Sequence, residues 1–244
     1  MNKISLKEVT NFVNQHIGEF HESRISRIRK IKLKDVLQKK NPYLFKAKNI
    51  LTAQKLIESL LQAYLSSSEE ELFGYFLEEL AIFVAGKTLN GKKSPGTGID
   101  LEFTKDGIVY LVSIKSGVNW GNSSQYAALR DRFKKAVQVL KQSKSVKSVQ
   151  PVLASCYGKR KTVDNGEYLR ICGQEFWYFI SGNQNFYIDI IEPLGHQAKQ
   201  HNQKYDEELA VVINKFTSEF SYEFCRDGKI DWNKLVRFNS GNSK

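Results

Sequence analysis

Hydrophobic positions in the first third of the chain recur at helical spacing. After Ser5, a candidate N-cap, apolar side chains follow every three or four residues, and the pattern returns over 51–65. Ser68 followed by Glu71 has the spacing of a capping box, which marks a helix start. We therefore predict one helix that begins at Ser5, a second over 51–65 and a third from 68 to about 85.

The middle of the chain changes to a period of two. Apolar and polar residues alternate over 99–104 and 108–115, and Lys105-Asp106-Gly107 between them predicts a hairpin turn. A helix is expected over 122–143, a buried strand over 149–157, short helices over 173–191 and a long helix over 196–224. This order predicts an α/β class, a small mixed sheet flanked by helices with a helical N-terminal region and long C-terminal helices. The expected boundaries are 1–66 for a helical region, 67–195 for the core and 196–244 for a C-terminal helical region.

The charge balance favours a polyanionic partner. Lysine and arginine total 37 against 26 acidic residues, a net charge of +11. The basic residues gather in three runs with no matching acidic block, which favours nucleic acid over a membrane surface. The runs comprise Arg24, Arg27, Arg29, Lys30, Lys32, Lys34, Lys39 and Lys40; Lys134, Lys135, Lys141, Lys144 and Lys147; and Lys159, Arg160 and Lys161.

Cysteines and histidines give no metal or disulfide pattern. The chain has 3 cysteines at wide spacings and no CxxC pair, which argues against a disulfide framework and a thiolate zinc site. The 4 histidines lack the spacing of metal ligands, and we expect them to be solvated at the surface. No apolar run approaches a membrane span, and the N-terminus lacks the apolar segment of a signal peptide. We therefore expect a cytoplasmic protein without membrane contact.

The predicted hairpin carries the candidate chemistry. Side chains two apart in a strand share a face, so Asp100 lies with Glu102, and Ser113 lies with Lys115. If the two faces coincide, the four side chains converge, while Tyr110, Val112 and Ile114 belong to the core. Lysine at the end of an apolar strand is unusual, and edge protection is the plain alternative for it. Carboxylates beside one lysine on a basic chain predict hydrolysis of a phosphodiester with a divalent metal.

These residues resemble a known nuclease signature. Pro95, then Gly98-Ile99-Asp100, then Ser113-Ile114-Lys115 is similar to the PD-(D/E)xK motif. The segment 93–124, with 173–177 and 190–195, resembles type II restriction endonucleases of a PmeII-like family, related to enzymes that cut GG/CC palindromes. The similarity covers most of the chain and is weakest before residue 50. It implies a restriction-endonuclease-like core and catalysis by Asp100 and Lys115. It further implies Mg²⁺ as cofactor and double-stranded DNA as substrate.

One position departs from that pattern. The superfamily has an acid two residues before the lysine, and this chain has Ser113, whose hydroxyl is a poor ligand for a hard cation. Glu102 on the strand face is one replacement. An acid of the preceding helix, Glu78 or its neighbour Glu79, is the other, and we favour Glu78 because small residues beside it permit close approach. One or two Mg²⁺ ions would then be held by Asp100, the carbonyl of Ile114, and Glu78 or Glu102.

Other residues are candidates for DNA contact. They combine amide, hydroxyl and basic groups near the catalytic strand, and they are Asn119, Trp120, Asn122, Ser123, Gln125, Lys159, Arg160 and Lys161. The first five also suit a polar loop that caps the next helix. The resemblance implies a homodimer on a palindromic site and a cognate DNA methyltransferase that is not in direct contact. A structure-specific or repair nuclease of the same fold and a non-catalytic DNA-binding protein remain alternatives.

Overall fold

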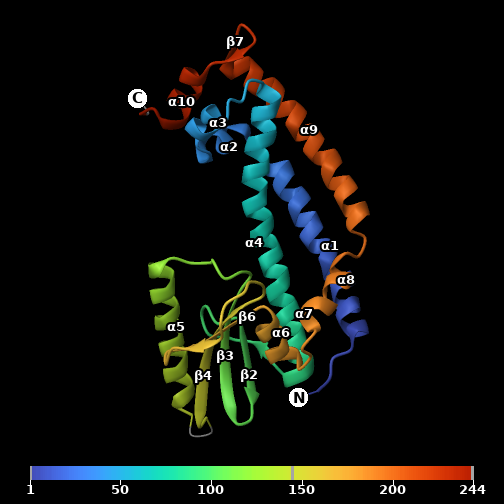
Figure 1. Cartoon of the computed structure of the whole chain (residues 1–244), viewed down its shortest axis with the longest axis vertical. Helices are drawn as coiled ribbons and strands as arrows, with labels where there is room; N and C mark the ends of the chain where they lie inside the picture. The colour runs from blue at the N-terminus through green and yellow to red at the C-terminus, as the bar shows by residue number, and fades with distance from the viewer. Residues whose placement is uncertain (1, 144–145, 243–244) are drawn as a thin grey trace. The chain divides into compact units, whose positions relative to one another are not determined.

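The computed structural model describes residues 2–143 and 146–242, shown in Figure 1. The chain divides into two compact units: unit 1 comprises Met1–Ile17 with Phe73–His196, and unit 2 comprises Gly18–Leu72 with Gln197–Lys244. Helices α1 (Leu6–Lys30) and α4 (Ala53–Leu89) each contribute residues to both units. The functional boundaries at 66 and 195 stay a prediction, because contact density defines compactness and does not assign a function.

Unit 1 is built on a mixed sheet of six strands in the order β1-β2-β3-β4-β6-β5. Neighbours β3, β4 and β6 run parallel, and the other pairs are antiparallel. The strands are β1 (Lys92–Lys93), β2 (Leu101–Lys105), β3 (Ile108–Lys115), β4 (Ser148–Ser155), β5 (Val163–Asp164) and β6 (Leu169–Cys172). The predicted class, a small mixed sheet flanked by helices, is confirmed. Strands β1, β5 and β6 were not predicted.

Helices cover both faces of this sheet (Figure 1). Helix α5 (Ser123–Lys141) makes the crossover from β3 to β4 and packs Leu129 and Phe133 against Leu111. On the other face, Phe179 of α6 (Gln174–Ser181) contacts Phe103 of β2. Two short helices, α7 (Phe186–Asp189) and α8 (Ile191–Leu194), follow α6 along the chain. Because both faces are covered, both faces of the central strands are buried.

The hairpin β2–β3 forms as predicted, and its burial differs from the prediction. Lys105 pairs with Ile108, so Asp106 and Gly107 form the two-residue turn, with φ of 51° and 77°. Positive φ at both central positions is the geometry that Asp-Gly favours. Val112 and Ile114 are buried as predicted, whereas Tyr110, also expected in the core, is only half-buried. Leu111 and Ser113 on the other face are buried as well, because α5 covers that face.

Helix α4 runs without a break where two helices were predicted. Ser68 lies inside the helix, and its hydroxyl accepts a hydrogen bond from Arg27 Nη1 at 2.6 Å. Glu71 pairs with the same arginine at 3.0 Å, so neither residue serves as a cap. The capping box was therefore wrong. The other predicted cap, Ser5 at the start of α1, is confirmed: its hydroxyl accepts a hydrogen bond from the Glu8 N–H.

Unit 2 is helical and has its own apolar core. Phe216, Phe220 and Phe224 of α9 are fully packed in it with Leu56 and Ile57 of α4. The long helix predicted over 196–224 is α9, and a predicted C-terminal helix begins after the N-cap Asp231. The other elements are α2 (Leu33–Lys39), α3 (Pro42–Ala47), α9 (Ala198–Phe224), β7 (Cys225–Arg226), β8 (Lys229–Ile230) and α10 (Trp232–Ser240). Within the described residues, no helix combines the length and apolar character that a bilayer span requires.

The first basic run is partly neutralised, contrary to expectation. Arg24 Nε lies 2.8 Å from Glu69 Oε1, and Arg29 pairs with Glu208. The sequence argument missed these acids because they lie far away along the chain. Arg24, Arg27 and Arg29 therefore hold helices of unit 2 together. Of the second run, Lys144 lies outside the described residues.

A histidine pair in unit 2 also corrects an expectation. The His21 ring is stacked on the His201 ring, with centroids 4.2 Å apart and planes within 5°. Only 8% of His21 is exposed, so it is not a solvated surface residue. Burial, helped by charge at His201 and Arg24, lowers the pKa of His21 from 6.5 to about 4.

The free energy of unfolding should fall as the pH drops from 6.5 toward 4. Above pH 6.5 His21 is neutral in both states; below it, the unfolded chain binds a proton that the folded chain resists. We expect His21→Gln to flatten this decrease. Urea unfolding at several pH values between 7 and 5 measures it, and equal slopes in the two proteins would contradict the assignment.

Candidate active site

The predicted catalytic residues lie at one edge of the sheet in unit 1. Lys115 is the last residue of β3, and Asp100 directly precedes the antiparallel strand β2. The parallel strands β4 and β6 end at the same edge, so the segments after Lys115, Ser155 and Cys172 are neighbours. Ligand sites of open α/β sheets form at such carboxyl ends.

Asp100 is held in place by the backbone and side chain of β3. Its Oδ2 accepts a hydrogen bond from the Ile114 N–H at 2.6 Å and one from the Ser113 hydroxyl at 3.3 Å. Its own N–H donates to the Val112 carbonyl at 2.9 Å. Ser113 is fully buried, and its hydroxyl donates to the carboxylate. It therefore orients Asp100, and the charge of the expected acid is missing from this position.

Lys115 places a cation beside that carboxylate. Its Nζ lies 3.7 Å from Asp100 Oδ2 and donates to the Ile114 carbonyl at 2.9 Å. The indole ring of Trp120 lies 5.4 Å from Nζ, measured to the ring centroid. The side chain is 28% exposed, so the ammonium is accessible at the sheet edge. Asp100, Ser113 and Lys115 therefore lie together, as the alternation of side chains along the two strands predicted.

Glu78 of α4 is the acid that approaches this group. Burial raises the pKa of Glu78, and the Asp100 charge raises it further, while Lys93 and Lys115 oppose the shift. Helix α4 comes close at Gly74, where an added Cβ would lie 3.3 Å from Ser116 Cβ. Gly74 thus permits the close approach of α4 to the segment after β3, as predicted for a small residue beside Glu78.

Glu102 lies on the expected strand face but contacts other groups. It pairs with Leu111, on the turn side of Ser113, and its carboxylate lies 3.9 Å from Lys92 Nζ and 3.4 Å from Ser94 Oγ. Burial raises the pKa of Glu78 most, and the charges of Asp100 and Lys115 act on it as well. Glu79 is exposed. The geometry thus favours Glu78 over Glu102 and Glu79.

The oxygen donors at this edge suit a hard cation. Two carboxylates, Asp100 and Glu78, and the Ile114 carbonyl are the kind of ligand that Mg²⁺ takes, with substrate oxygens and water completing its shell. Burial and then the Asp100 charge raise the pKa of Glu78, and a bound cation would offset both effects. Among residues 2–143 and 146–242, no group of three or more His, Cys, Asp or Glu side chains is arranged to hold a metal.

The loop after β3 is used partly for helix capping. Asn122 caps α5: its side chain accepts from the Gln125 N–H at 3.1 Å, and Gln125 Oε1 accepts from the Asn122 N–H at 2.9 Å. Trp120 packs on Tyr126, with ring centroids 4.7 Å apart. Ser123 is exposed at the first position of the helix. These contacts favour the structural interpretation for Asn122, Gln125 and Trp120.

The loop after β4 carries exposed cations. Arg160 Nη2 donates to Asn119 Oδ1 at 2.9 Å, so the structure joins two predicted contact residues. Lys159 and Lys161 are exposed, and neither makes a hydrogen bond or ion pair within the described part of the chain. Gly158, with φ of 113°, lets the loops meet, because an added Cβ would lie 2.5 Å from Val118 Cγ1.

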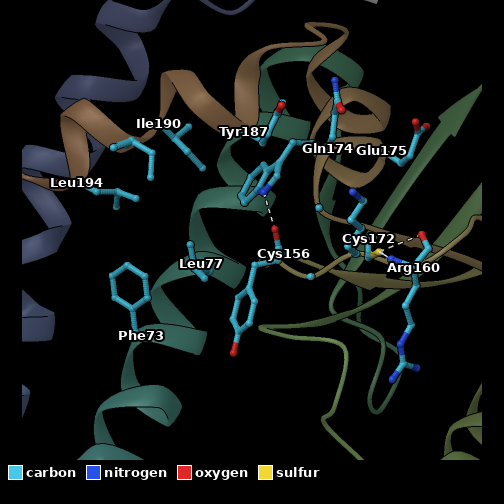
Figure 2. A pocket seen from close by; sticks show the side chains of 16 residues that line it. Phe73, Leu77, Cys156, Arg160, Cys172, Gln174, Glu175, Tyr187, Ile190 and Leu194 are labelled. Carbon is cyan, nitrogen blue, oxygen red and sulfur yellow. Dashed lines mark hydrogen bonds between the residues drawn. The ribbon is translucent and has the colours of Figure 1, made fainter.

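A pocket of about 680 Å³ lies beside this edge. Figure 2 shows Leu77 and Phe73 of α4 on one side of it and Gln174, Glu175 and Tyr187 on another. Cys156, a buried residue directly after β4, is among the residues that line the pocket. Burial, with the Glu78 and Asp100 charges, raises the pKa of this thiol.

Cys156 and Cys172 belong to this region and were not predicted from the sequence as part of it. Cys172 ends β6, a strand that was not predicted, and its thiol contacts the backbone of Arg160. The alternation over 169–172 before Gly173 was the available signal. Cys156 follows β4, and its carbonyl accepts from Trp177 Nε1 at 2.8 Å.

The chain matches the model of a known protein family. The family model described as "Type II restriction endonuclease EcoO109I" matches residues 7–202, which include every residue of the site. No curated protein matches the chain closely enough to count as a relative.

Proposed function

Because the chain belongs to the EcoO109I family of type II restriction endonucleases, we propose that it cleaves double-stranded DNA at a specific sequence with Mg²⁺. The observation that carries this proposal is the Lys115 ammonium 3.7 Å from the Asp100 carboxylate, together with Glu78, whose pKa is raised by burial and then by the Asp100 charge. A cation and paired acids at one edge of a sheet are the groups that phosphodiester hydrolysis requires. The proposal includes membership of the PD-(D/E)xK superfamily, and the narrower PmeII-like resemblance stays a prediction.

Asp100, Glu78 and the Ile114 carbonyl would hold the metal. Bound there, Mg²⁺ would lower the pKa of a water ligand and offset negative charge on the phosphate. Asp100 is fixed by the Ile114 N–H and the Ser113 hydroxyl, so little reorganisation is needed to present its other oxygen. Lys115 donates to the oxygen that gains charge during attack and orients the water. Ser113 acts by positioning Asp100.

The proposal extends to assembly and biological partner. A palindromic target is matched by a two-fold symmetric pair of chains, so we propose a homodimer. The cognate partner in the same system is a DNA methyltransferase that protects the site without touching this chain.

The alternatives separate by substrate and by product. Type II activity predicts discrete fragments from a plasmid and no preference for flaps or junctions. A repair nuclease of the same fold would cut labelled flap or four-way junction DNA faster than linear duplex. The serine at position 113 favours one further candidate, a binding protein, which would show salt-sensitive DNA binding without cleavage under any metal.

Substituting the two candidate acids identifies the second carboxylate. Glu78→Gln should lower the cleavage rate by about 10²-fold or more and raise the Mg²⁺ concentration for half-maximal rate, because a metal ligand is lost. Glu102→Gln is the matched control and should retain most activity, since Glu102 contacts Lys92 and Ser94. Rates measured over a Mg²⁺ titration decide this. If Glu102→Gln slowed cleavage and Glu78→Gln did not, Glu102 would be the second carboxylate that binds the metal.

A further inference from the structure

Arg160 differs from its basic neighbours because it is fixed at both ends. Its backbone N–H donates to Cys172 Sγ at 3.2 Å, and the Cys172 thiol donates to its carbonyl at 3.5 Å (Figure 2). At the other end, Nη2 donates to Asn119 Oδ1 at 2.9 Å. The loop backbone is therefore held at Cys172, and the guanidinium is directed by its bond to Asn119 before any ligand arrives.

The fixed guanidinium still has donors to offer. The Asn119 contact uses one N–H, and Arg160 is exposed. Figure 2 shows its side chain extending away from the pocket-lining residues Gln174 and Glu175. Asn119 belongs to the loop after Lys115, so the guanidinium lies at the same sheet edge as the candidate active site.

A phosphate contact does not need such fixation. A phosphate is contacted by either kind of cation: a guanidinium can donate to two of its oxygens, and a flexible lysine such as Lys159 or Lys161 acts as a point charge. Distinguishing one base edge from another requires a planar donor pair of defined direction, and guanine offers the matching acceptors O6 and N7. A guanidinium oriented in advance loses less entropy when it makes such a pair.

We propose that Arg160 is a specificity-determining residue that contacts a guanine edge, with Asn119 and Cys172 as positioning residues. Lys159 and Lys161 contact phosphates only. The inference rests on the proposed function, since it assumes a DNA substrate, and it adds which residue distinguishes the sequence.

Selection from a random duplex pool tests this assignment. Bound DNA is sequenced for the wild type without Mg²⁺, and cleaved ends are sequenced with Mg²⁺, so the preference is measured whether or not the chain cuts. Arg160→Ala and Arg160→Lys should reduce the ratio of preferred to next-best sequence by about 10- to 100-fold, with the loss at a G·C pair. Because Arg160 is exposed, both variants should keep the wild-type unfolding temperature.

The neighbouring residues supply matched controls. Lys159→Ala should weaken binding to all sequences by the same factor. It should reduce the slope of log binding constant against log salt concentration by about 1 and leave the ratio of preferred to next-best sequence unchanged. Asn119→Leu should lower the ratio, and Asn119→Asp, which keeps an acceptor for Arg160, should restore it.

Two outcomes would overturn the inference. One is an Arg160→Ala protein that binds all sequences more weakly while keeping every base preference, which is the behaviour of a phosphate contact. The other is a wild type that binds DNA without preference. A wild type that selects a sequence through Arg160 but never cuts would refute the nuclease proposal alone.

Discussion

Asp100→Asn should reduce DNA cleavage in Mg²⁺ by about 10²–10⁴-fold, the loss expected when several kcal/mol of metal-derived stabilisation disappear. The amide oxygen can still accept the hydrogen bond that the Ile114 N–H now donates at 2.6 Å, so the hairpin should stay intact. The substitution removes the charge that pairs with Lys115 and that would hold the cation. Single-turnover cleavage rates measure the effect.

Asp106→Asn is the matched control for this experiment. Asp106 lies in the turn at the opposite end of the same hairpin, is exposed, and has a φ of 51°, which asparagine also adopts. The same loss of one charge there should leave the rate unchanged. If both variants slowed cleavage equally, net charge rather than a metal site at Asp100 would explain the result.

Lys115→Met should lower the rate by about 10²–10³-fold, the usual effect of removing one donor to a developing oxyanion. Methionine keeps the apolar stem beside Trp120 and removes the ammonium, which donates to the Ile114 carbonyl at 2.9 Å. DNA binding should change little, because one phosphate contact among several is lost. Rate and binding constant, measured on the same duplex, separate the two effects.

Lys105→Met controls for the loss of a lysine at a strand end. Lys105 closes the hairpin at its far end, with Nζ 5.5 Å from the Phe179 ring centroid. The Lys105→Met protein should cleave DNA at the wild-type rate. A Lys115→Met protein that cleaves as fast as this control would refute the catalytic role of Lys115.

Local pattern was sufficient to predict the hairpin and which side chains meet on it. Alternation places Asp100, Ser113 and Lys115 on one face, and the Asp106-Gly107 turn fixes the register that brings Asp100 opposite Ser113. The same argument placed Glu102 on that face, but a shared face does not give distance along the strand. Glu102 lies beside Leu111, toward the turn, and pairs with Lys92.

Contacts between distant segments could not be predicted this way. Glu69 and Glu208 neutralise arginines of α1, and no local pattern reveals such partners. Ser68 has the spacing of a cap, and its bond to Arg27 lets the helix continue instead. The anchoring of Arg160 by Cys172 depends on strand β6, whose four residues alternate too briefly to predict a strand without the neighbouring strand β4.

Digestion of a plasmid by the wild type and by Asp100→Asn, followed by sequencing of the fragment ends, tests the central claim most directly. The account predicts discrete fragments from the wild type that share one sequence at their ends, appear only with Mg²⁺, and are absent with Asp100→Asn. Intact plasmid with the wild type in Mg²⁺, or equal cutting by both proteins, would contradict it.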